Sequence, residues 1–206
     1  MNCGLHLIEE EMIEIFTKCG ALQEGHYEYA SGRHGGVYVN KNLVIACPSY
    51  LRQLCQIIAQ EYAGLEIQAV AAPATGGIAL TQWVADFLTG FNNLPPEKQV
   101  LALYAEKDGE KLVFSRQYDQ LLDDKRVLVL EDIVTTGGSL NKLIRSVEDC
   151  GGQVIGGAVL WNRGGIEFDV PTISLVQKQY PSWLESECPL CRVGVPLNTD
   201  LGHAKK

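Results

Sequence analysis

Apolar runs alternate with glycine-rich turns along most of the chain, and their spacing predicts alternating strands and helices. Short continuous apolar runs are typical of strands that are buried on both faces. They occur at residues 67–72, 100–104, 127–130 and 154–161. Helical spacing of apolar residues is found at residues 5–19, 50–62, 78–88 and 139–147. This alternation predicts an α/β fold with a mostly parallel central sheet flanked by helices.

One strand–loop–helix unit carries an unusual set of polar residues. The apolar run ends at Glu131 and Asp132, and residues 133–139 then read Ile-Val-Thr-Thr-Gly-Gly-Ser before the next helix. Backbone N–H groups are unpaired at a helix start, glycines allow a ligand to approach, and the helix dipole favours an anion. The hydroxyl groups of the loop add further donors. The segment therefore predicts a phosphate site.

The two carboxylates need a different partner, because they would repel a phosphate. Sugar hydroxyls suit them, so a ribose 5-phosphate satisfies both halves of residues 131–139. The chain has neither a Gly-x-x-x-x-Gly-Lys-Ser/Thr loop nor a Gly-x-Gly-x-x-Gly loop in this segment. A capped helix after an ordinary strand would explain the apolar run and Ser139, but not the acidic pair followed by Thr-Thr-Gly-Gly.

A second glycine-rich loop follows the strand at residues 67–72. It reads Pro-Ala-Thr-Gly-Gly at residues 73–77 and also precedes a predicted helix. Taken alone, it is either a tight turn or a second anion site. Two such loops at neighbouring strand ends suit a ligand with two phosphate groups.

Two other segments are predicted to form hairpins. Residues 25–41 alternate around a Ser31-Gly32 turn, and several polar side chains crowd it, so the segment is either a plain hairpin or a substrate flap. Residues 105–118 are charged and contain a glycine, which indicates either a solvated surface hairpin or a mobile lid. A lid would exclude water from a hydrolysable sugar phosphate.

Composition limits the possible functions. The chain has 206 residues, 46% of them hydrophobic, and a net charge of −8. The acidic balance argues against a nucleic-acid partner or an anionic membrane surface, and no apolar run approaches the length of a membrane helix. We expect one domain in the cytoplasm. The seven cysteines are expected to be mostly reduced. Cys188 and Cys191 form half of a possible zinc site, with structural thiols as the alternative.

Residues 127–139 resemble the phosphoribosyl pyrophosphate (PRPP) signature of type I phosphoribosyltransferases. The Ser-Gly hairpin, the loop at residues 72–77, Arg163 after the strand at 154–161, and the Cys-Pro-Leu-Cys tail resemble the orotate phosphoribosyltransferase family. The chain departs from that family's common pattern at Ala30, Gly76 and Gln117 and in its last residues.

The resemblance implies a type I phosphoribosyltransferase fold with a small hood. Residues 1–45 and about 165–206 would contribute the hood and tail, and about 46–164 the core of a single domain spanning residues 1–206. It also implies Mg²⁺-dependent transfer of ribose 5-phosphate from PRPP to orotate, which gives orotidine 5′-monophosphate and pyrophosphate. The partners would be PRPP, orotate and a second copy of the chain, with the lid at residues 105–118 shared across the dimer.

The same resemblance assigns the site residues. The catalytic residues would be Asp132, Glu131 and Lys107. PRPP would be bound by Glu131, Asp132, Val134, Thr135, Thr136, Gly137, Gly138, Ser139, Ala74, Thr75, Gly76, Lys107 and Arg116. Orotate would be bound by Arg163, Thr135, Tyr38 and Lys41. Mg²⁺ would be held mainly by PRPP and water, without direct side-chain ligands, and a metal at Cys188 and Cys191 is a separate possibility.

Two alternatives remain at the level of the sequence. A phosphoribosyltransferase for another nucleobase would keep the PRPP residues and differ in the hairpin near Ser31 and at Arg163. A non-catalytic protein that senses PRPP would use the same fold and bind the ligand without turnover.

Overall fold

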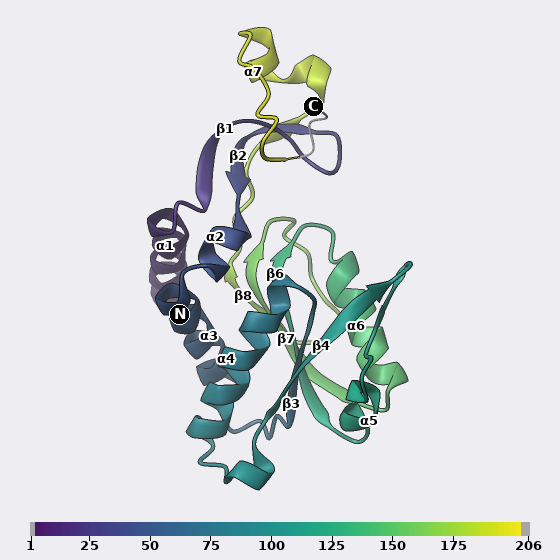
Figure 1. Cartoon of the computed structure of the whole chain (residues 1–206). Coiled ribbons are helices and arrows are strands. Elements are labelled where there is room, and N and C mark those ends of the chain that lie inside the picture. Colours follow the sequence, from purple (N-terminus) through teal and green to yellow (C-terminus); the bar gives the residue numbers. More distant parts are fainter. Residues whose placement is uncertain (1–2, 203–206) are drawn as a thin grey trace.

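A six-stranded sheet lies at the centre of the computed structural model (Figure 1), which describes the backbone of residues 3–202. Its strand order is β5-β4-β3-β6-β7-β8. The strands are β3 (Ala69–Pro73), β4 (Leu101–Asp108), β5 (Lys111–Val113), β6 (Arg126–Val134), β7 (Gln153–Asn162) and β8 (Thr172–Val176). All neighbours are parallel except β4 and β5, which form an antiparallel hairpin at the edge. The predicted fold class is confirmed.

Successive side chains of the central strands point to opposite faces of the sheet, and this divides the core into two layers. Leu128 and Leu130 of β6 pack in one hydrophobic cluster, while Val127 and Val129 pack in the other. Successive side chains of a strand point to opposite faces, so a strand covered on both faces reads as a continuous apolar run. This explains why the sequence shows uninterrupted apolar runs at β3 and β6.

Helices cover both faces of this sheet. The cluster around Leu128 and Leu130 includes residues of four helices: α1 (Cys3–Lys18), α2 (Lys41–Ile45), α3 (Pro48–Tyr62) and α4 (Gly76–Phe91). The opposite cluster includes residues of α5 (Tyr118–Leu122) and α6 (Gly138–Asp149). Phe16 of α1 meets the buried Trp161 of β7 edge to face at 4.9 Å, which fixes α1 on the sheet. A short turn, η1 (Pro96–Lys98), links α4 to β4.

A second, smaller sheet forms the hood, which lies above the core in Figure 1. It contains β1 (Leu22–Glu28), β2 (His34–Val39) and β9 (Ser182–Trp183) in the order β1-β2-β9. After β9 the chain forms η2 (Glu185–Glu187) and α7 (Pro189–Arg192) in the same region. The predicted hairpin around Ser31-Gly32 is present, since β1 and β2 are antiparallel with Glu28 opposite His34. The hood therefore joins two segments from opposite ends of the sequence.

Strand β6 is longer than the apolar run that predicted it. Its ladder with β7 continues through Glu131 opposite Val159 and Val134 opposite Asn162. The acidic pair thus belongs to the strand, because pairing with β7 supplies backbone hydrogen bonds that the local pattern of β6 does not show.

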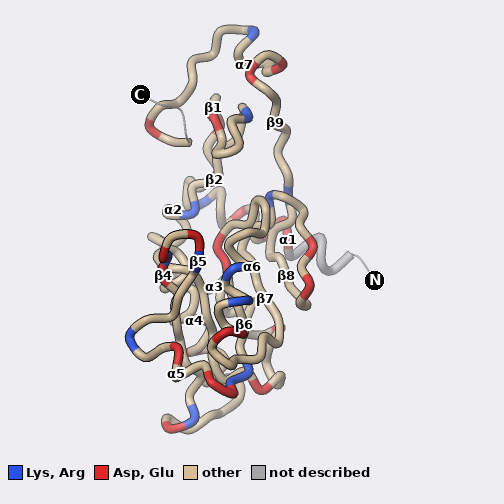
Figure 2. The backbone as a smooth tube through the Cα atoms, turned by 90° about the vertical axis from the view of Figure 1, so that its right-hand side faces the viewer, with Lys and Arg blue, Asp and Glu red and all other residues tan. Residues whose placement is uncertain are grey.

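None of the described helices is long and apolar enough to cross a membrane. Figure 2 shows acidic and basic residues interspersed along both the core and the hood.

Candidate active site

The two adjacent carboxylates at the end of β6 point to opposite faces of the sheet. Asp132 follows the alternation of Leu128 and Leu130 toward α2 and α4, whereas Glu131 follows Val127 and Val129 toward α6. Both are buried, with 2% of Asp132 and 7% of Glu131 exposed. The pair therefore places one carboxylate in each helix layer at the carboxyl end of the same strand.

Asp132 connects β6 to the first turn of α2. Lys41 Nζ lies 2.8 Å from its Oδ1 and 2.7 Å from its Oδ2, and the Ile133 N–H donates to Oδ1 at 2.7 Å. The loop before α4 lies against the same carboxylate, because a Cβ added to Gly76 would be 2.1 Å from Oδ2. Any side chain at position 76 would displace this group. The close approach is a reason for glycine at a position where the sequence departs from the common family pattern.

The environment of Glu131 is less favourable for a negative charge than that of Asp132. Burial is the main cause that raises its pKa from 4.5 to about 7, the negative charge of Asp132 adds to the rise, and a hydrogen bond from the Ser139 side chain opposes it. Its Oε2 is buried and has no hydrogen-bond partner among the described residues. A buried acceptor without a partner is costly. A ligand hydroxyl that donates to Oε2 would satisfy it.

The loop between β6 and α6 surrounds a cavity of about 150 Å³ that Glu131 helps to line. It is lined by Glu131, Ile133, Val134, Thr135, Thr136, Gly137, Gly138, Ser139 and Leu140. Gly137 precedes α6 with φ +76°, a conformation that side chains rarely adopt, and Thr135 and Thr136 are exposed. The first N–H groups of α6 have no partner within the helix. The predicted phosphate loop therefore adjoins the carboxylate proposed to bind sugar hydroxyls.

The second glycine-rich loop lies at the neighbouring strand. Strands β3 and β6 pair directly, with Ala71 opposite Val129, so their carboxyl ends lie side by side. After β3, the Ala74 N–H donates to Ala105 O at 2.8 Å, the Ala74–Thr75 peptide bond is cis, and α4 begins at Gly76. The structure thus brings the two loops that the sequence identified to adjacent strand ends.

Arg163 follows β7, and its backbone N–H donates to Val134 O at 2.8 Å. Its guanidinium carbon lies 4.8 Å from the ring centre of Tyr29 in the hood. The next residue, Gly164, is packed so closely that an added Cβ would be 1.9 Å from the Thr135 carbonyl oxygen. Arg163 therefore lies between the hood and the phosphate loop. Tyr38, also predicted to contact orotate, is half-buried on β2, with its ring 5.4 Å from that of Tyr27.

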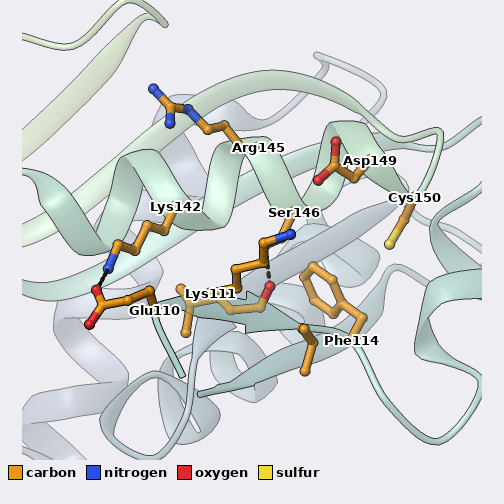
Figure 3. Close-up of a pocket in the computed structure, with 10 residues that line it drawn as sticks. Glu110, Lys111, Phe114, Lys142, Arg145, Ser146, Asp149 and Cys150 are labelled. Carbon is orange, nitrogen blue, oxygen red and sulfur yellow. Dashed lines mark hydrogen bonds and ion pairs between the residues drawn. The ribbon is translucent and has the colours of Figure 1, made fainter. Parts of the chain in front are cut away.

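The segment at residues 105–118 forms the β4–β5 hairpin and rests on α6 of the same chain (Figure 3). Lys142 of α6 pairs with Glu110 at 3.2 Å, and the Ser146 hydroxyl donates to Leu112 O. A cavity of about 460 Å³ separates parts of the two elements.

The two predicted pyrophosphate ligands belong to this hairpin. Lys107 is exposed on β4, opposite Leu112. Arg116 pairs with Glu106 at 3.6 Å and is 70% exposed. Both cations are therefore accessible in this arrangement, and the Arg116–Glu106 pair is weak enough to exchange for a stronger anion.

Sequence reasoning missed several contacts that assemble this site. Lys41 was expected to bind orotate, but its ion pair with Asp132 was not foreseen. The stacking of Arg163 on Tyr29 and the packing of Gly76 on Asp132 were also missed. Each contact joins segments that are far apart in the chain, so no local pattern could have indicated it. His26 was not singled out at all, although it lies beside His34 and the Cys-x-x-Cys pair.

Comparisons with known proteins agree with this geometry. The phosphoribosyl transferase domain model matches residues 40–171. The orotate phosphoribosyltransferase of Caldanaerobacter subterraneus subsp. tengcongensis is 35% identical over 191 residues, covering 92% of this chain and 95% of that protein. The Thermus thermophilus protein of the same name is 34% identical, covering 91% and 98%. The Mycobacterium tuberculosis H37Rv orotate phosphoribosyltransferase, solved in complex with PRPP, has a TM-score of 0.61 at 19% identity, covering 82% and 95%.

A buried acidic pair and two neighbouring glycine-rich loops at the carboxyl edge of a parallel sheet are the arrangement expected of an α/β protein that binds a phosphorylated sugar. The matches make the assignment specific. The chain belongs to the phosphoribosyltransferase family, and the relatives that share most of its length are orotate phosphoribosyltransferases.

Proposed function

We propose that this protein transfers the ribose 5-phosphate group of PRPP to orotate, in the synthesis of pyrimidine nucleotides. The bond between C1 of the ribose and the pyrophosphate oxygen breaks, and C1 bonds to a ring nitrogen of orotate that gives up its proton. The products are orotidine 5′-monophosphate and pyrophosphate. The observation that carries the proposal is the buried Oε2 of Glu131, which has no hydrogen-bond partner among the described residues, in a side chain that lines the cavity of the phosphate loop.

The ribose 5-phosphate end of PRPP would occupy the cavity beside α6. The N–H groups and hydroxyls of residues 135–139 would bind the phosphate, with the helix dipole adding favourable potential. Glu131 Oε2 would accept a hydrogen bond from a ribose hydroxyl, which favours its charged form and lowers the raised pKa. Binding would thereby place negative charge near C1, where positive charge develops in the transition state.

Asp132 would act from the other face of β6. Its two oxygens are held by Lys41 and by the Ile133 N–H, so the carboxylate is fixed in position before the substrate arrives. Preorganised charge of this kind stabilises an oxocarbenium-like centre without reorganisation. No covalent nucleophile is needed, and catalysis rests on position and electrostatics.

The departing pyrophosphate would be bound by Ala74, Thr75 and Gly76, with Lys107 and Arg116 supplied by the β4–β5 hairpin. Arg116 would exchange Glu106 for the pyrophosphate, and closure of the hairpin would exclude water. The hairpin rests on α6 of its own chain here. In a homodimer, which we also propose, the same hairpin would cover the partner's site.

Mg²⁺ is the proposed cofactor, and the donors of the site fit it. Both carboxylates offer oxygen, the ligand that Mg²⁺ prefers. Asp132 is already engaged by Lys41, so direct ligation by that side chain is disfavoured, and the diphosphate oxygens and water would hold the ion. When bound, Mg²⁺ supplies positive charge that stabilises the leaving pyrophosphate.

Orotate would lie between the hood and the phosphate loop. The guanidinium of Arg163 suits the orotate carboxylate through two parallel hydrogen bonds. Thr135, Tyr38 and Lys41 would complete the pocket, and the stacking of Arg163 on Tyr29 supports its orientation toward the hood. The described cysteines form no disulfide with one another, which supports a reducing compartment such as the cytoplasm.

The deciding assay follows the ultraviolet absorbance of orotate with purified protein, PRPP and Mg²⁺. We expect PRPP-dependent loss of orotate, and a fall in kcat of about 100-fold or more for Asp132→Asn, because a charge that stabilises the transition state is removed. Asp86→Asn, an exposed change on α4, is the matched control and should keep full activity.

Other results would contradict the proposal. Turnover with adenine, hypoxanthine, guanine or uracil in place of orotate would show a different base specificity. PRPP binding by calorimetry without turnover of any base would show a sensor.

A further inference from the structure

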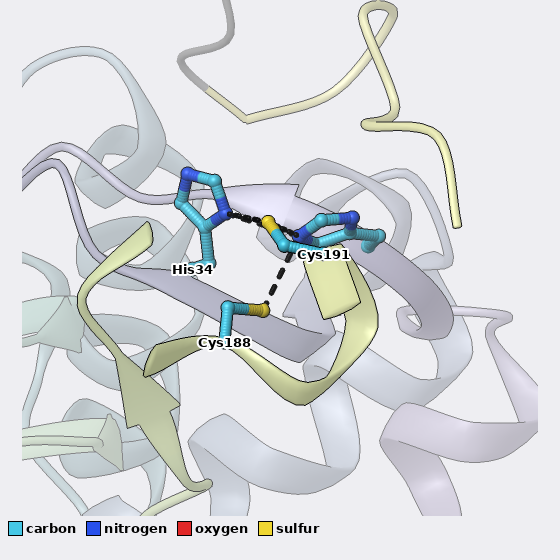
Figure 4. Close-up of side chains that lie close together, drawn as sticks. His34, Cys188 and Cys191 are labelled. Atoms are coloured by element: carbon cyan, nitrogen blue, oxygen red, sulfur yellow. Dashed lines mark hydrogen bonds between the residues drawn. The ribbon is translucent and has the colours of Figure 1, made fainter. Parts of the chain in front are cut away.

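Two histidines and two cysteines converge inside the hood. His26 comes from β1, His34 from the first position of β2, Cys188 from the end of η2 and Cys191 from α7. One ligand atom from each lies within 4.8 Å of the others, and Figure 4 shows His34, Cys188 and Cys191 directed toward one another. His26, His34 and Cys188 are 2%, 4% and 0% exposed. Two histidines and two cysteines are a usual ligand set of a structural zinc site, and three of these four residues are buried.

The distances fit a tetrahedron. Ligands at ordinary Zn–N and Zn–S lengths are separated by about 3.3 Å for two nitrogens and about 3.6 Å for nitrogen and sulfur. Here His26 Nε2 lies 3.0 Å from His34 Nδ1, 3.5 Å from Cys188 Sγ and 3.6 Å from Cys191 Sγ. His34 Nδ1 lies 3.2 Å from Cys191 Sγ. Each of these distances is within about 0.4 Å of the tetrahedral value.

The hydrogen bonding of His26 gives a second argument. Its Nδ1 lies 2.7 Å from Val195 O, and a carbonyl oxygen only accepts, so Nδ1 carries the proton. In the neutral ring, Nε2 then has one lone pair, yet three polar atoms crowd around it. One lone pair cannot accept from three donors, whereas a cation at the centre takes one lone pair from each group. A backbone carbonyl behind a metal-bound histidine is also the common outer contact.

We propose that His26 Nε2, His34 Nδ1, Cys188 Sγ and Cys191 Sγ bind one Zn²⁺ as a closed structural site. Two thiolates and two imidazoles favour zinc over Mg²⁺, so this site is chemically distinct from the one that handles PRPP. With four protein ligands the ion has no open position for a substrate.

The zinc would fasten the end of the chain to the N-terminal hairpin. Among the described residues after β9, up to residue 202, the regular elements are the short η2 and α7. The Asn198 N–H of this tail donates to His26 O at 2.8 Å, and β9 before it is bound by Arg33, which donates to Ser182 O at 2.5 Å. The hairpin also carries Tyr29 and leads into Lys41, so the metal would keep both residues in place over the core.

Metal analysis of the purified protein tests this proposal. Inductively coupled plasma mass spectrometry should find one zinc per chain, and Cys188→Ser and Cys191→Ser should each lose most of it. Cys55→Ser matches Cys188 in burial, Cys150→Ser matches Cys191 in partial exposure, and both should retain the metal.

A spectroscopic measurement keeps the test valid if the cysteine variants fail to fold. Wild-type protein exchanged into Co²⁺ should show the intense visible d–d bands of tetrahedral cobalt and thiolate charge-transfer bands. Absence of zinc in reduced wild-type protein, even after incubation with zinc and removal of excess, would overturn the proposal. So would a Cys188–Cys191 disulfide in protein purified under reducing conditions, or octahedral cobalt without thiolate bands.

Discussion

The active-site edge of the core and the metal cluster of the hood are built in opposite ways. At the core edge, the acidic pair and the phosphate loop come from one continuous segment, and β6 and α6 hold it in place. In the hood, the ligands come from both ends of the chain, with His34 and Cys191 separated by 157 positions.

The comparison shows what each kind of site depends on. Glu131 and the loop after it keep their local geometry as long as the sheet is intact, because one strand and one helix carry them. The cluster in the hood exists only when two distant segments are folded together, and few secondary-structure elements hold its C-terminal half. Loss of a contact between these two segments should therefore lower the local stability of the hood more than a comparable loss lowers that of the core site.

Removing the hood metal should have the largest effect on stability. Chelation of wild-type protein, or Cys188→Ser, is expected to cost about 3 kcal/mol and to lower the melting temperature by about 6–12 °C. Orotate KM should rise more than the Kd of PRPP, since the hood carries Tyr29, whose ring lies against the guanidinium of Arg163. Calorimetry and steady-state kinetics would measure this, with Cys55→Ser as the control. An equal fold-change in orotate KM and in the Kd of PRPP would show that the hood affects both binding sites alike, which would contradict this prediction.

Glu131→Gln should change the pH dependence of stability. The folded protein raises the pKa of this carboxyl from 4.5 to about 7, so it binds more protons than the unfolded chain between these values. Stability from this group is therefore present below pH 4.5 and is lost as the pH rises through 7. The loss is about 3 kcal/mol.

The measurement is urea denaturation at pH 5 and pH 8. Glutamine has no proton to lose, so Glu131→Gln should be more stable than wild type at pH 8, and the difference should shrink at pH 5. Glu148→Gln, an exposed change on α6, should leave the wild-type pH dependence intact. An unchanged slope in Glu131→Gln would contradict the burial argument.

Gly76→Ala tests the contact between the second loop and Asp132. The added Cβ would meet Oδ2 at 2.1 Å, so the carboxylate must shift away from its position beside Lys41. We expect kcat/KM to fall by about tenfold, because a displaced catalytic group loses transition-state stabilisation. Gly90→Ala on the same helix meets no atom within 4 Å and should keep activity. Wild-type kinetics in Gly76→Ala would show that Asp132 tolerates displacement.

Glu106→Gln should have the smallest effect. The exposed ion pair with Arg116 contributes little, so unfolding free energy should change by less than about 0.5 kcal/mol. If Arg116 moves to the pyrophosphate, its release should lower the Kd of PRPP slightly. Glu110→Gln, which removes the Lys142 pair on the same hairpin, is the control. Weaker PRPP binding in Glu106→Gln would contradict the proposed exchange of partners.

The sequence by itself determined the α/β class, the order of the core elements and the position of the glycine-rich loop after the acidic pair, which stays a predicted phosphate site. These features follow from local causes, since apolar periodicity reports burial and a Thr-Thr-Gly-Gly loop after an acidic pair suits only a few ligands. The sequence did not determine where the strands end. The sequence placed the end of the strand at Leu130, but pairing with β7 extends β6 to Val134.

Only the tertiary structure decided which distant groups meet. The opposite faces of Glu131 and Asp132, the pairing of Asp132 with Lys41 and the packing of Gly76 depend on how the layers are stacked. In the sequence, Cys188 and Cys191 appeared as half of a candidate metal site, and the structure places His26 and His34 of the predicted hairpin beside them. A chain pattern reports spacing along the backbone, whereas a metal site or an ion pair depends on distances in space. Those distances are set by the completed fold.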